Sequence, residues 1–404
     1  MNPTFSMTEQ IQNLLEKGVS RIIERESLEK KLASGKPLRV KFGIDPTGTI
    51  MHLGHAVPIM KLRQFQDLGH HVIILIGDAT AQVGDTSDKD AERPMLKREE
   101  TRKNAESYVA KFSKILDTSK VEIYYNSEGL DRVNFCGVGE LAKHFSVAEM
   151  LDRDNFSKRH KAGVRISLQE FLYPIMQGYD SVALKADVEL GGNDQYFNLL
   201  AGRRLQEAFG QPKQDIMTFD LLLGPDGKKM SKTGGNCIAV DMEPNAMFVK
   251  LMEVKDELIL DYFRLTTPLT LKEIEPYRAR LESEENPRNI KLDLARTIVT
   301  FYHGPDAAEA GRAYFEKVLS EGVTPSEDEM EKAYVESEEI GLLALVKAIG
   351  FAATTGEAKT AITGGGTKIN GEKVTDDRAP IRLSKTKGTV VQVGKKKFKL
   401  VFSK

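Results

Sequence analysis

The pattern of hydrophobic and polar residues predicts a parallel sheet in the first part of the chain. Residues 37–44 (PLRVKFGI) alternate apolar and polar side chains and run into the turn sequence DPTGT, as a strand followed by a loop does. Residues 55–68 carry apolar side chains at helical spacing, and Gly69 can end that helix. The run VIILIGDAT is almost entirely apolar, which is typical of a strand buried on both faces. Strand, helix and buried strand form a βαβ unit, so we expect an α/β fold with a Rossmann-like parallel sheet.

The same pattern predicts further elements on both sides of this unit. The first 18 residues (MNPTFSMTEQIQNLLEKG) have an amphipathic helical pattern and lack the apolar core of a signal peptide. Helices and short strands then alternate as far as residue 223. The helices are expected at 97–116, 138–160, 167–184 and 195–209, and the strands at 121–126, 187–190 and 218–223.

Beyond Pro244 the pattern changes, and the change divides the chain into three expected domains. Charged segments with helical period continue to residue 319, and residues 321–340 then hold eight acids and one lysine, as in a linker or a solvated helix. The last block combines two short helices (GLLALVKAIG and TGEAKTAIT), a glycine-rich turn and short strands. We expect a sheet domain over 1–240, a helical domain with an acidic linker over 241–335 and a small α+β domain over 340–404.

Composition narrows the class of protein. No run of about 18 uncharged apolar residues is present, so the sequence predicts no membrane span. Cys136 and Cys237 form neither a metal-binding spacing nor a disulfide framework, which favours a reducing cytoplasm. From Gly341 to Lys404 the chain has 13 Lys or Arg against 4 Asp or Glu. Such a basic segment is consistent with binding to a phosphate-rich partner, and it is equally consistent with a charged surface that is only solvated.

The first chemical motif is DPTGTIMHLGH, at residues 45–55. It follows a predicted strand, at the edge of a parallel sheet where ligands bind. His52, Gly54 and His55 stand at the expected helix start, where backbone amides and two imidazoles suit a phosphate. A metal site is disfavoured because no neighbouring residue completes a ligand set and HExxH is absent. A pair of surface histidines is the remaining alternative.

The second motif is KKMSKT, at residues 228–233, between Gly227 and Gly234–Gly235. Its three lysines, its two hydroxyls and the flanking glycines suit a loop that binds a triphosphate. A basic loop alone is also typical of a solvated surface. The occurrence of HLGH followed by KMSKT in one chain is a much more specific sequence signal than either motif alone.

The two motifs resemble the signature motifs of class I aminoacyl-tRNA synthetases, and the resemblance covers the whole chain. It implies that an amino acid's carboxylate attacks the α-phosphate of ATP, while the enzyme positions the reactants and neutralises charge. Mg²⁺ is expected to arrive with ATP, without a protein metal site. The resemblance assigns the phosphates to His52, His55, Lys229, Lys232 and Thr47. It assigns ATP or the adenylate to Gly43, Asp45, Gly54, Gly192, Asp194, Met230, Ser231 and Thr233.

Within this class, the segments YPIMQGYD and ELGGNDQYFN resemble the tyrosyl enzymes. Tyr173, Gln177 and Asp180 share one helical face, and the resemblance places Asp180 at the substrate's phenol and the other two at its ammonium group. Lys41 stands where many tyrosyl enzymes have a tyrosine that donates to the phenol, so either Lys41 or another group joins Asp180 there. The tryptophanyl enzymes are the nearest alternative. The resemblance also assigns tyrosine to Asp85, Thr80 and Gln195.

The C-terminal segment LLALVKAIGFAATTGEAKTAITGGGTKINGEKV resembles the RNA-binding domain of ribosomal small-subunit protein 4. Together with the basic charge it predicts RNA binding, and the helical block before it would be the anticodon-side domain. The family also implies a homodimer through an inserted segment at about residues 125–165. The expected function is that of a tyrosine–tRNA ligase with L-tyrosine, ATP and tRNA as its partners. An RNA-binding paralogue without activity is the alternative from another functional class.

Overall fold

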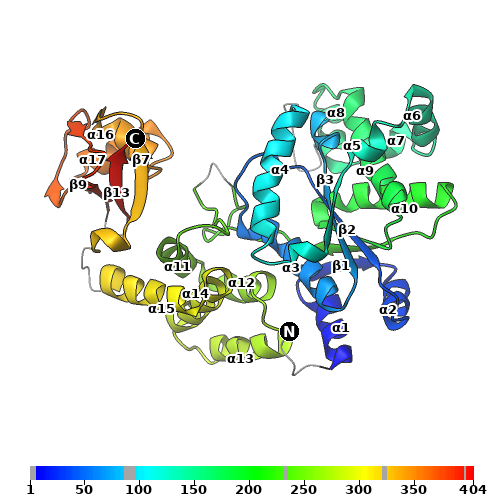
Figure 1. Cartoon of the computed structure of the whole chain (residues 1–404), viewed down its shortest axis with the longest axis horizontal. Coiled ribbons are helices and arrows are strands. Elements are labelled where there is room, and N and C mark those ends of the chain that lie inside the picture. Colours follow the sequence, from blue (N-terminus) through cyan, green and yellow to red (C-terminus); the bar gives the residue numbers. More distant parts are fainter. Residues whose placement is uncertain (1–5, 86–95, 232–234, 321–324, 395–396) are drawn as a thin grey trace. The chain divides into compact units, whose positions relative to one another are not determined.

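The structure is a computed structural model that describes residues 6–85, 96–231, 235–320, 325–394 and 397–404. The chain forms two compact units, which are coloured along the sequence in Figure 1. The first consists of Met1–Leu222 with Asp261–Glu275, and the second of Leu223–Leu260 with Pro276–Lys404.

The first unit is built on a six-stranded sheet in the order β1-β6-β5-β2-β3-β4. Strands β2 to β6 run parallel, and only β1 is antiparallel, at the edge beside β6. The buried positions of β3 are apolar throughout, as its sequence predicted. The strands are β1 (Val19–Ile23), β2 (Arg39–Ile44), β3 (His71–Ile76), β4 (Val121–Tyr125), β5 (Val188–Gly192) and β6 (Asp215–Phe219).

The strand order fixes where the helices lie and where a ligand can bind. The chain moves outward from β2 to β4, returns past β2 to β5, and then continues to β6. Because crossovers between parallel strands are right-handed, the two directions place their helices on opposite faces. Helices α3 (Leu53–Asp67) and α4 (Arg98–Phe112) cover one face, and α9 (Leu168–Leu184) and α10 (Tyr196–Ala208) cover the other (Figure 1). The strand order reverses between β2 and β5, so a ligand crevice is expected at their carboxyl ends.

The predicted α/β fold with a Rossmann-like parallel sheet is confirmed, with local corrections. The helix expected at 138–160 is three short ones, because Ser146 and Arg153 adopt extended backbone conformations between them. The strand expected at 218–223 is β6, whose first residue, Asp215, aligns with Val188 of β5. Strand β1 was not predicted. The remaining helices of this unit are α1 (Met7–Glu16), α2 (Arg25–Ala33), α5 (Ser127–Leu130), α6 (Phe135–Ala142), α7 (Val147–Leu151) and α8 (Asp154–Lys161).

The helical part of the second unit matches the predicted pattern. Its inward faces are apolar, and Gly311 of α15 lies against the Phe248 ring of α11. Helices α12 and α13 extend across the boundaries between the two units. The helices are α11 (Pro244–Met252), α12 (Ile259–Thr266), α13 (Leu271–Glu282), α14 (Pro287–His303) and α15 (Pro305–Tyr314).

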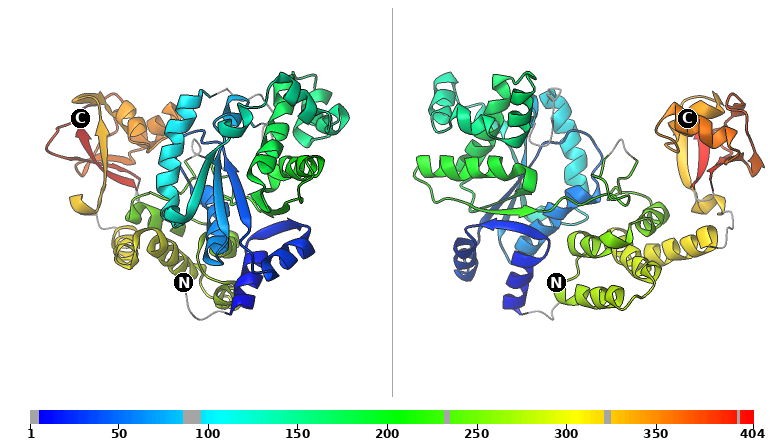
Figure 2. Two further views of the ribbon diagram at one scale, coloured as in Figure 1. Left: turned by 45° about the vertical axis from the view of Figure 1, so that its right-hand side comes forward. Right: turned by 180° about the vertical axis from the view of Figure 1, so that it is seen from behind.

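The expectation of a linker or solvated helix at 321–340 is wrong for the described residues, 325–340. They include β7 (Glu331–Val335) and β8 (Glu339–Gly341), because β7 pairs in parallel with β13 (Lys397–Ser403). A Lys399–Glu331 ion pair of 2.9 Å joins these strands, and Ala333 packs on the C-terminal core. Figure 2 shows these strands beside helices α16 (Leu342–Ala348) and α17 (Thr355–Thr363). The other strands are β9 (Thr367–Ile369), β10 (Glu372–Lys373), β11 (Pro380–Arg382) and β12 (Thr389–Val393).

Helices α9 and α10 approach each other closely at Gly178, which generates a stability prediction. A Cβ atom at Gly178 would lie 2.9 Å from the backbone carbonyl of Ala201, which cannot move aside as a flexible side chain does. Gly178→Ala should therefore lower the free energy of unfolding by about 1–3 kcal/mol. Gly356→Ala is the control, since a Cβ there meets only the Thr354 hydroxyl at 3.9 Å. Urea unfolding of both variants checks this, and equal stability of the two would contradict it.

Candidate active site

Polar residues gather where neighbouring parallel strands end. Asp45 follows β2, Thr80 lies four residues after β3, and Asn126 directly follows β4. The Gly192 loop continues from β5 on the other side of the strand-order reversal. Because parallel strands end at one edge, these loops form a common rim at the expected ligand position.

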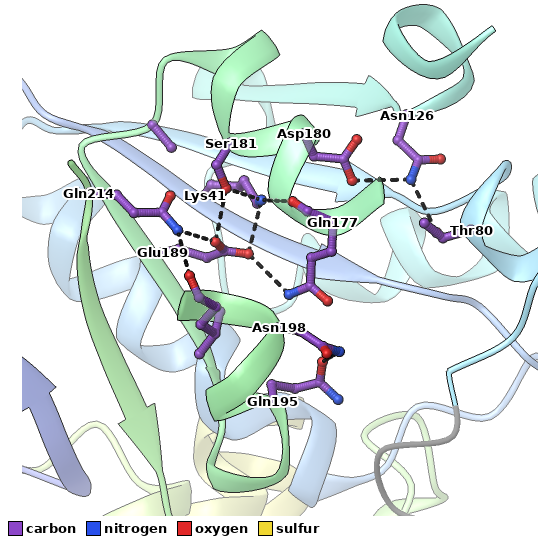
Figure 3. A network of polar contacts seen from close by, with 12 residues as sticks. Lys41, Thr80, Asn126, Gln177, Asp180, Ser181, Glu189, Gln195, Asn198 and Gln214 are labelled. Carbon is purple, nitrogen blue, oxygen red and sulfur yellow. Dashed lines mark hydrogen bonds and ion pairs between the residues drawn. The ribbon is translucent and has the colours of Figure 1, made fainter. Parts of the chain in front are cut away.

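A chain of hydrogen bonds links helix α9 to this rim. The Tyr173 hydroxyl donates to Asp45 Oδ2 at 2.9 Å, and the Thr80 hydroxyl donates to Asp45 Oδ1 at 2.9 Å. The Asn126 amide donates to Thr80 Oγ1 at 3.1 Å and to Asp180 Oδ2 at 3.2 Å, as Figure 3 shows. The structure thus brings Tyr173, Asp45, Thr80 and Asp180 together through Asn126.

The carboxyl group of Asp180 is in an unusual electrostatic setting. Burial raises its pKa to about 8, and the nearby charges of Glu189 and Asp45 act in the same direction. Lys41 and the Asn126 hydrogen bond lower the pKa, but they only partly offset the burial. A buried carboxyl group of this kind has a strong tendency to find a hydrogen-bonding partner, such as the hydroxyl of a ligand.

A second polar group lies on the loop after β5. Gln195 Nε2 donates to Asp85 Oδ2 at 2.7 Å, and Asn198 Nδ2 donates to Gln195 Oε1 at 3.1 Å. Asp194 is exposed beside them, and a Cβ atom at Gly192 would overlap its carboxylate. Asp85 and Gln195, predicted as substrate residues from distant segments, are therefore direct neighbours.

The histidine motif begins helix α3. The rings of His52 and His55 are stacked, with centroids 3.8 Å apart, and the His52 N–H donates to His55 Nδ1 at 3.4 Å. A Cβ atom at Gly54 would lie 3.1 Å from the His52 ring, so a larger residue would crowd the pair. Thr47 is exposed on the preceding loop, and Gly43 is exposed on β2.

Helix α4 braces the loop that leads to these histidines. Asn104 Nδ2 donates to the Pro46 carbonyl at 3.0 Å, and the Tyr108 hydroxyl donates to the Ile50 carbonyl at 3.1 Å. Lys111 Nζ donates to the Thr49 carbonyl at 2.5 Å. Side chains of one helix thus hold three carbonyls of the loop in place.

The KMSKT motif belongs to the second unit, where a small hairpin presents it. Lys229 forms a β-bridge with Leu223, and Gly227 turns the chain with a positive φ of 78°. Asn236 accepts from the Ser231 N–H at 2.9 Å and donates to the Lys229 carbonyl at 3.2 Å. The Lys229 side chain is exposed, whereas Met230 is buried. Lys232 and Thr233 lie outside the described residues.

Lys41 has a different environment from the one suggested by its place in the family pattern. Its ammonium group is completely buried and contacts the Glu189 carboxylate at 2.9 Å, the Ser181 hydroxyl at 2.7 Å and the Gln177 carbonyl at 3.3 Å. An ammonium group has three donor hydrogens, and these three acceptors can use them all. Figure 3 shows the group between β2 and α9.

Sequence reasoning missed several residues of this region. Asn126 is the last residue of the short strand predicted at 121–126, so the rule that ligands bind at the carboxyl ends of parallel strands could have selected it. Glu189 is an acid inside the predicted strand 187–190, a pattern that requires a buried partner. Nothing in the sequence marked Asn104 or Tyr108, because their role depends on how α4 crosses the loop.

No separate metal centre is found among the residues that the structure describes. No three His, Cys, Asp or Glu side chains there are grouped to hold a metal ion. Within the same residues, no helix has the length and apolar character needed to cross a membrane.

Comparison with known proteins identifies the family. Residues 33–320 match the family model of class I tRNA synthetases for tryptophan and tyrosine. The chain is 46% identical to a tyrosine–tRNA ligase of Oleidesulfovibrio alaskensis, over 98% of both chains. It is 45% identical to a tyrosine–tRNA ligase of Thermotoga maritima, over 96% of both. A truncated mitochondrial tyrosyl-tRNA synthetase of Aspergillus nidulans has the same fold, with a TM-score of 0.65 and 22% identity over 76% of this chain and 93% of that one. The chain therefore belongs to the class I aminoacyl-tRNA synthetases and, among them, to the tyrosine–tRNA ligases.

Proposed function

We propose that this chain activates L-tyrosine with ATP and transfers the tyrosyl group to the 3′ end of a tRNA. The observation that carries the choice of amino acid is the buried carboxyl group of Asp180, on the face of α9 that also presents Tyr173. A phenolic hydroxyl is a hydrogen-bonding partner that suits this group. The indole of tryptophan offers only a donor and is larger.

The residues on the rim suggest a position for each part of tyrosine. Asp85, with Gln195 2.7 Å away, supplies negative charge for the ammonium group, and Tyr173 and Gln177 complete that side. Asp180 takes the phenol at the other end of α9's polar face, with Asn126 and Thr80 behind it. In this arrangement the substrate's carboxylate is directed toward the loops that bind ATP.

The chemistry needs no protein nucleophile or base. The carboxylate oxygen of tyrosine attacks the α-phosphate, the bond to the β-phosphate breaks, and pyrophosphate leaves. His52, His55 and Thr47 are proposed to donate to the phosphates as negative charge develops, and Lys229 and Lys232 to follow the pyrophosphate. Gly43, Asp45, Gly54, Gly192, Asp194, Met230, Ser231 and Thr233 are proposed to contact ATP or the adenylate. Mg²⁺ would be bound through the nucleotide's phosphates, and the cytoplasm, where charged tRNA is used, is the proposed location.

Pyrophosphate exchange with each amino acid in turn tests this function. Tyrosine should support exchange of pyrophosphate into ATP, whereas tryptophan and phenylalanine should be nearly inert. Phenylalanine has no hydroxyl to form a hydrogen bond with the buried Asp180 carboxyl group, which is strongly unfavourable for its binding. Faster exchange with tryptophan than with tyrosine would mean that tyrosine is not the substrate. Absence of exchange with any amino acid would favour a non-catalytic RNA-binding paralogue.

We also propose that the chain acts as a homodimer through the segment around residues 125–165. Large apolar side chains are exposed in or next to this segment, with Phe135 92%, Val147 65% and Leu168 80% exposed. Apolar side chains this exposed favour burial in a protein interface.

Substitutions in this segment test the dimer. Phe135→Ser with Leu168→Ser should produce monomers at micromolar concentration, because each change removes apolar area that the interface would bury. Met7→Ser, at an equally apolar side chain that is 61% exposed on α1, is the control and should leave the association unchanged. Sedimentation equilibrium measures the outcome, and a monomeric starting protein would overturn the proposal.

The domain roles proposed for the rest of the chain follow the expected boundaries. Residues 1–240 would hold the catalytic site, 241–335 would contact the anticodon side of the tRNA, and 340–404 would bind RNA. Lys368 on β9 and Lys373 on β10 have exposed side chains at a hairpin of the last block. Their charges fit contact with a phosphate backbone.

Charge removal at this hairpin tests RNA binding. Lys368→Gln with Lys373→Gln should leave tyrosine-dependent pyrophosphate exchange unchanged and weaken tRNA binding. The log–log slope of binding against salt should become shallower by about 0.7–0.9 for each RNA phosphate that the hairpin no longer neutralises. Lys213→Gln, at a partly exposed lysine paired with Glu207 in the first unit, is the control. Unchanged salt dependence in the double variant would remove this hairpin from the RNA-binding surface.

A further inference from the structure

The ion pair between Lys41 and Glu189 is almost completely enclosed in the first unit. The Lys41 side chain is 0% exposed and the Glu189 side chain 1%, with 2.9 Å between the ammonium nitrogen and the nearer carboxylate oxygen. The two residues are register partners on β2 and β5, the strands between which the strand order reverses. Burying both charges is unfavourable unless other hydrogen bonds satisfy them. Their surroundings therefore show what the pair holds in place.

Both charged groups are fully engaged with helix α9 and its neighbours. Glu189 Oε1 accepts from the Gln177 side-chain amide at 3.2 Å, and Oε2 accepts from the Ser181 hydroxyl at 3.0 Å and from the Gln214 amide. Lys41 donates to the Gln177 carbonyl and to the Ser181 hydroxyl. The pair thus contacts consecutive turns of α9, at Gln177 and Ser181, on either side of Asp180 (Figure 3).

The contact with Gln177 determines which way its amide points. A carboxylate accepts hydrogen bonds and cannot donate them, so the amide nitrogen of Gln177 must face Glu189. The amide oxygen then points away from Glu189, where it can accept a hydrogen bond from a ligand. An ammonium group is a donor only, and it needs an acceptor oriented in this way.

We propose that Lys41 and Glu189 are positioning residues for tyrosine, which orient the Gln177 amide and hold the turn of α9 that presents Asp180. This inference rests on the proposed function of the site. It assigns Lys41 no contact with the phenol, and so corrects the expectation that Lys41 itself binds the substrate. Lys41 acts through its contacts with Gln177 and Ser181 of α9.

A purely structural role for the pair would have different consequences. A structural pair affects folding and leaves the affinity for each substrate unchanged, whereas a positioning pair changes the KM for tyrosine selectively. The chain offers a control in Lys31 and Asp215, which form another 2.9 Å pair in the same unit, with Lys31 23% and Asp215 1% exposed. Within the described part of the chain, that pair interacts with neither Gln177 nor Asp180.

The test replaces the pair by neutral side chains of similar size, Lys41→Met with Glu189→Gln. Neutral replacement of a buried ion pair often preserves folding, which a thermal unfolding scan verifies. The amide that replaces the carboxylate can donate as well as accept, so the Gln177 amide loses its fixed orientation. The KM for tyrosine in pyrophosphate exchange should rise about 10- to 100-fold, the range for a hydrogen bond to a charged group, with kcat and the KM for ATP nearly unchanged. Lys31→Met with Asp215→Asn should alter none of these values.

A double-mutant comparison makes the test specific to Gln177. Gln177→Met should raise the KM for tyrosine by a similar factor, and adding it to the pair variant should raise KM little further, because both changes remove one interaction. An unchanged KM in the folded pair variant, or fully additive effects, would overturn the proposal. If the pair variant does not fold, Glu189→Asp takes its place, because it keeps the charge but shortens the side chain. An unchanged KM for tyrosine in Glu189→Asp would also count against the proposal. A native chain without tyrosine-dependent exchange would instead refute the proposed function.

Discussion

Helix α9 carries charged and polar side chains into the interior of the first unit, and each of them needs a partner there. Asp180, Ser181 and the partly buried Gln177 all lie on this helix, facing Asn126, Lys41 and Glu189. The helix can approach so closely because Gly178 contacts the backbone of Ala201 in α10. An unsatisfied buried polar group is more unfavourable than a net hydrogen bond is favourable. The requirement for partners therefore fixes the position of α9 against β2, β5 and the end of β4.

This requirement connects stability with substrate selection. A site that must satisfy a buried carboxyl group accepts a ligand with a hydroxyl at that point and rejects one without it, and tyrosyl enzymes are themselves the known example of this effect. Burial raises the pKa of Asp180 to about 8, so at neutral pH the group is able to donate as well as accept a hydrogen bond. A bound phenol can adapt to either state because its hydroxyl is both donor and acceptor. The raised pKa also lets the Asp180 carboxyl group stay buried when no ligand is bound, because the protonated group carries no charge. Asn126 is then its hydrogen-bonding partner within the chain.

The sequence contained the information for the sheet and for most of the rim. Apolar runs such as VIILI identify buried strands, and the edge rule for parallel strands places the loop that begins at Asp45 where ligands bind. The roles of Asp45 and Thr80 themselves came from the family resemblance. What could not be predicted depends on pairing between distant segments. Strand β7 was missed because its partner β13 lies more than sixty residues later and supplies the apolar contacts and the ion pair that its acidic sequence lacks. The helix break at Arg153 was missed for a related reason, since the guanidinium of Arg153 packs over the rings of Phe156 and Phe197.

Lys41 stands where many tyrosyl enzymes have a tyrosine, and only the tertiary structure shows what this lysine contacts. Read along β2, a lysine in place of a tyrosine suggests a new contact with the substrate, because the position is the one that faces it in the family pattern. The register of β2 with β5 places Glu189 directly beside it, and a carboxylate 2.9 Å away binds an ammonium group more strongly than a neutral phenol would. The ammonium group of Lys41 therefore turns toward Glu189 and also contacts Gln177 and Ser181 of α9. In the role proposed for it, Lys41 acts on the substrate only through these contacts. The charge of the neighbour across the sheet thus decides where this side chain points, which alignment of motifs alone does not reveal.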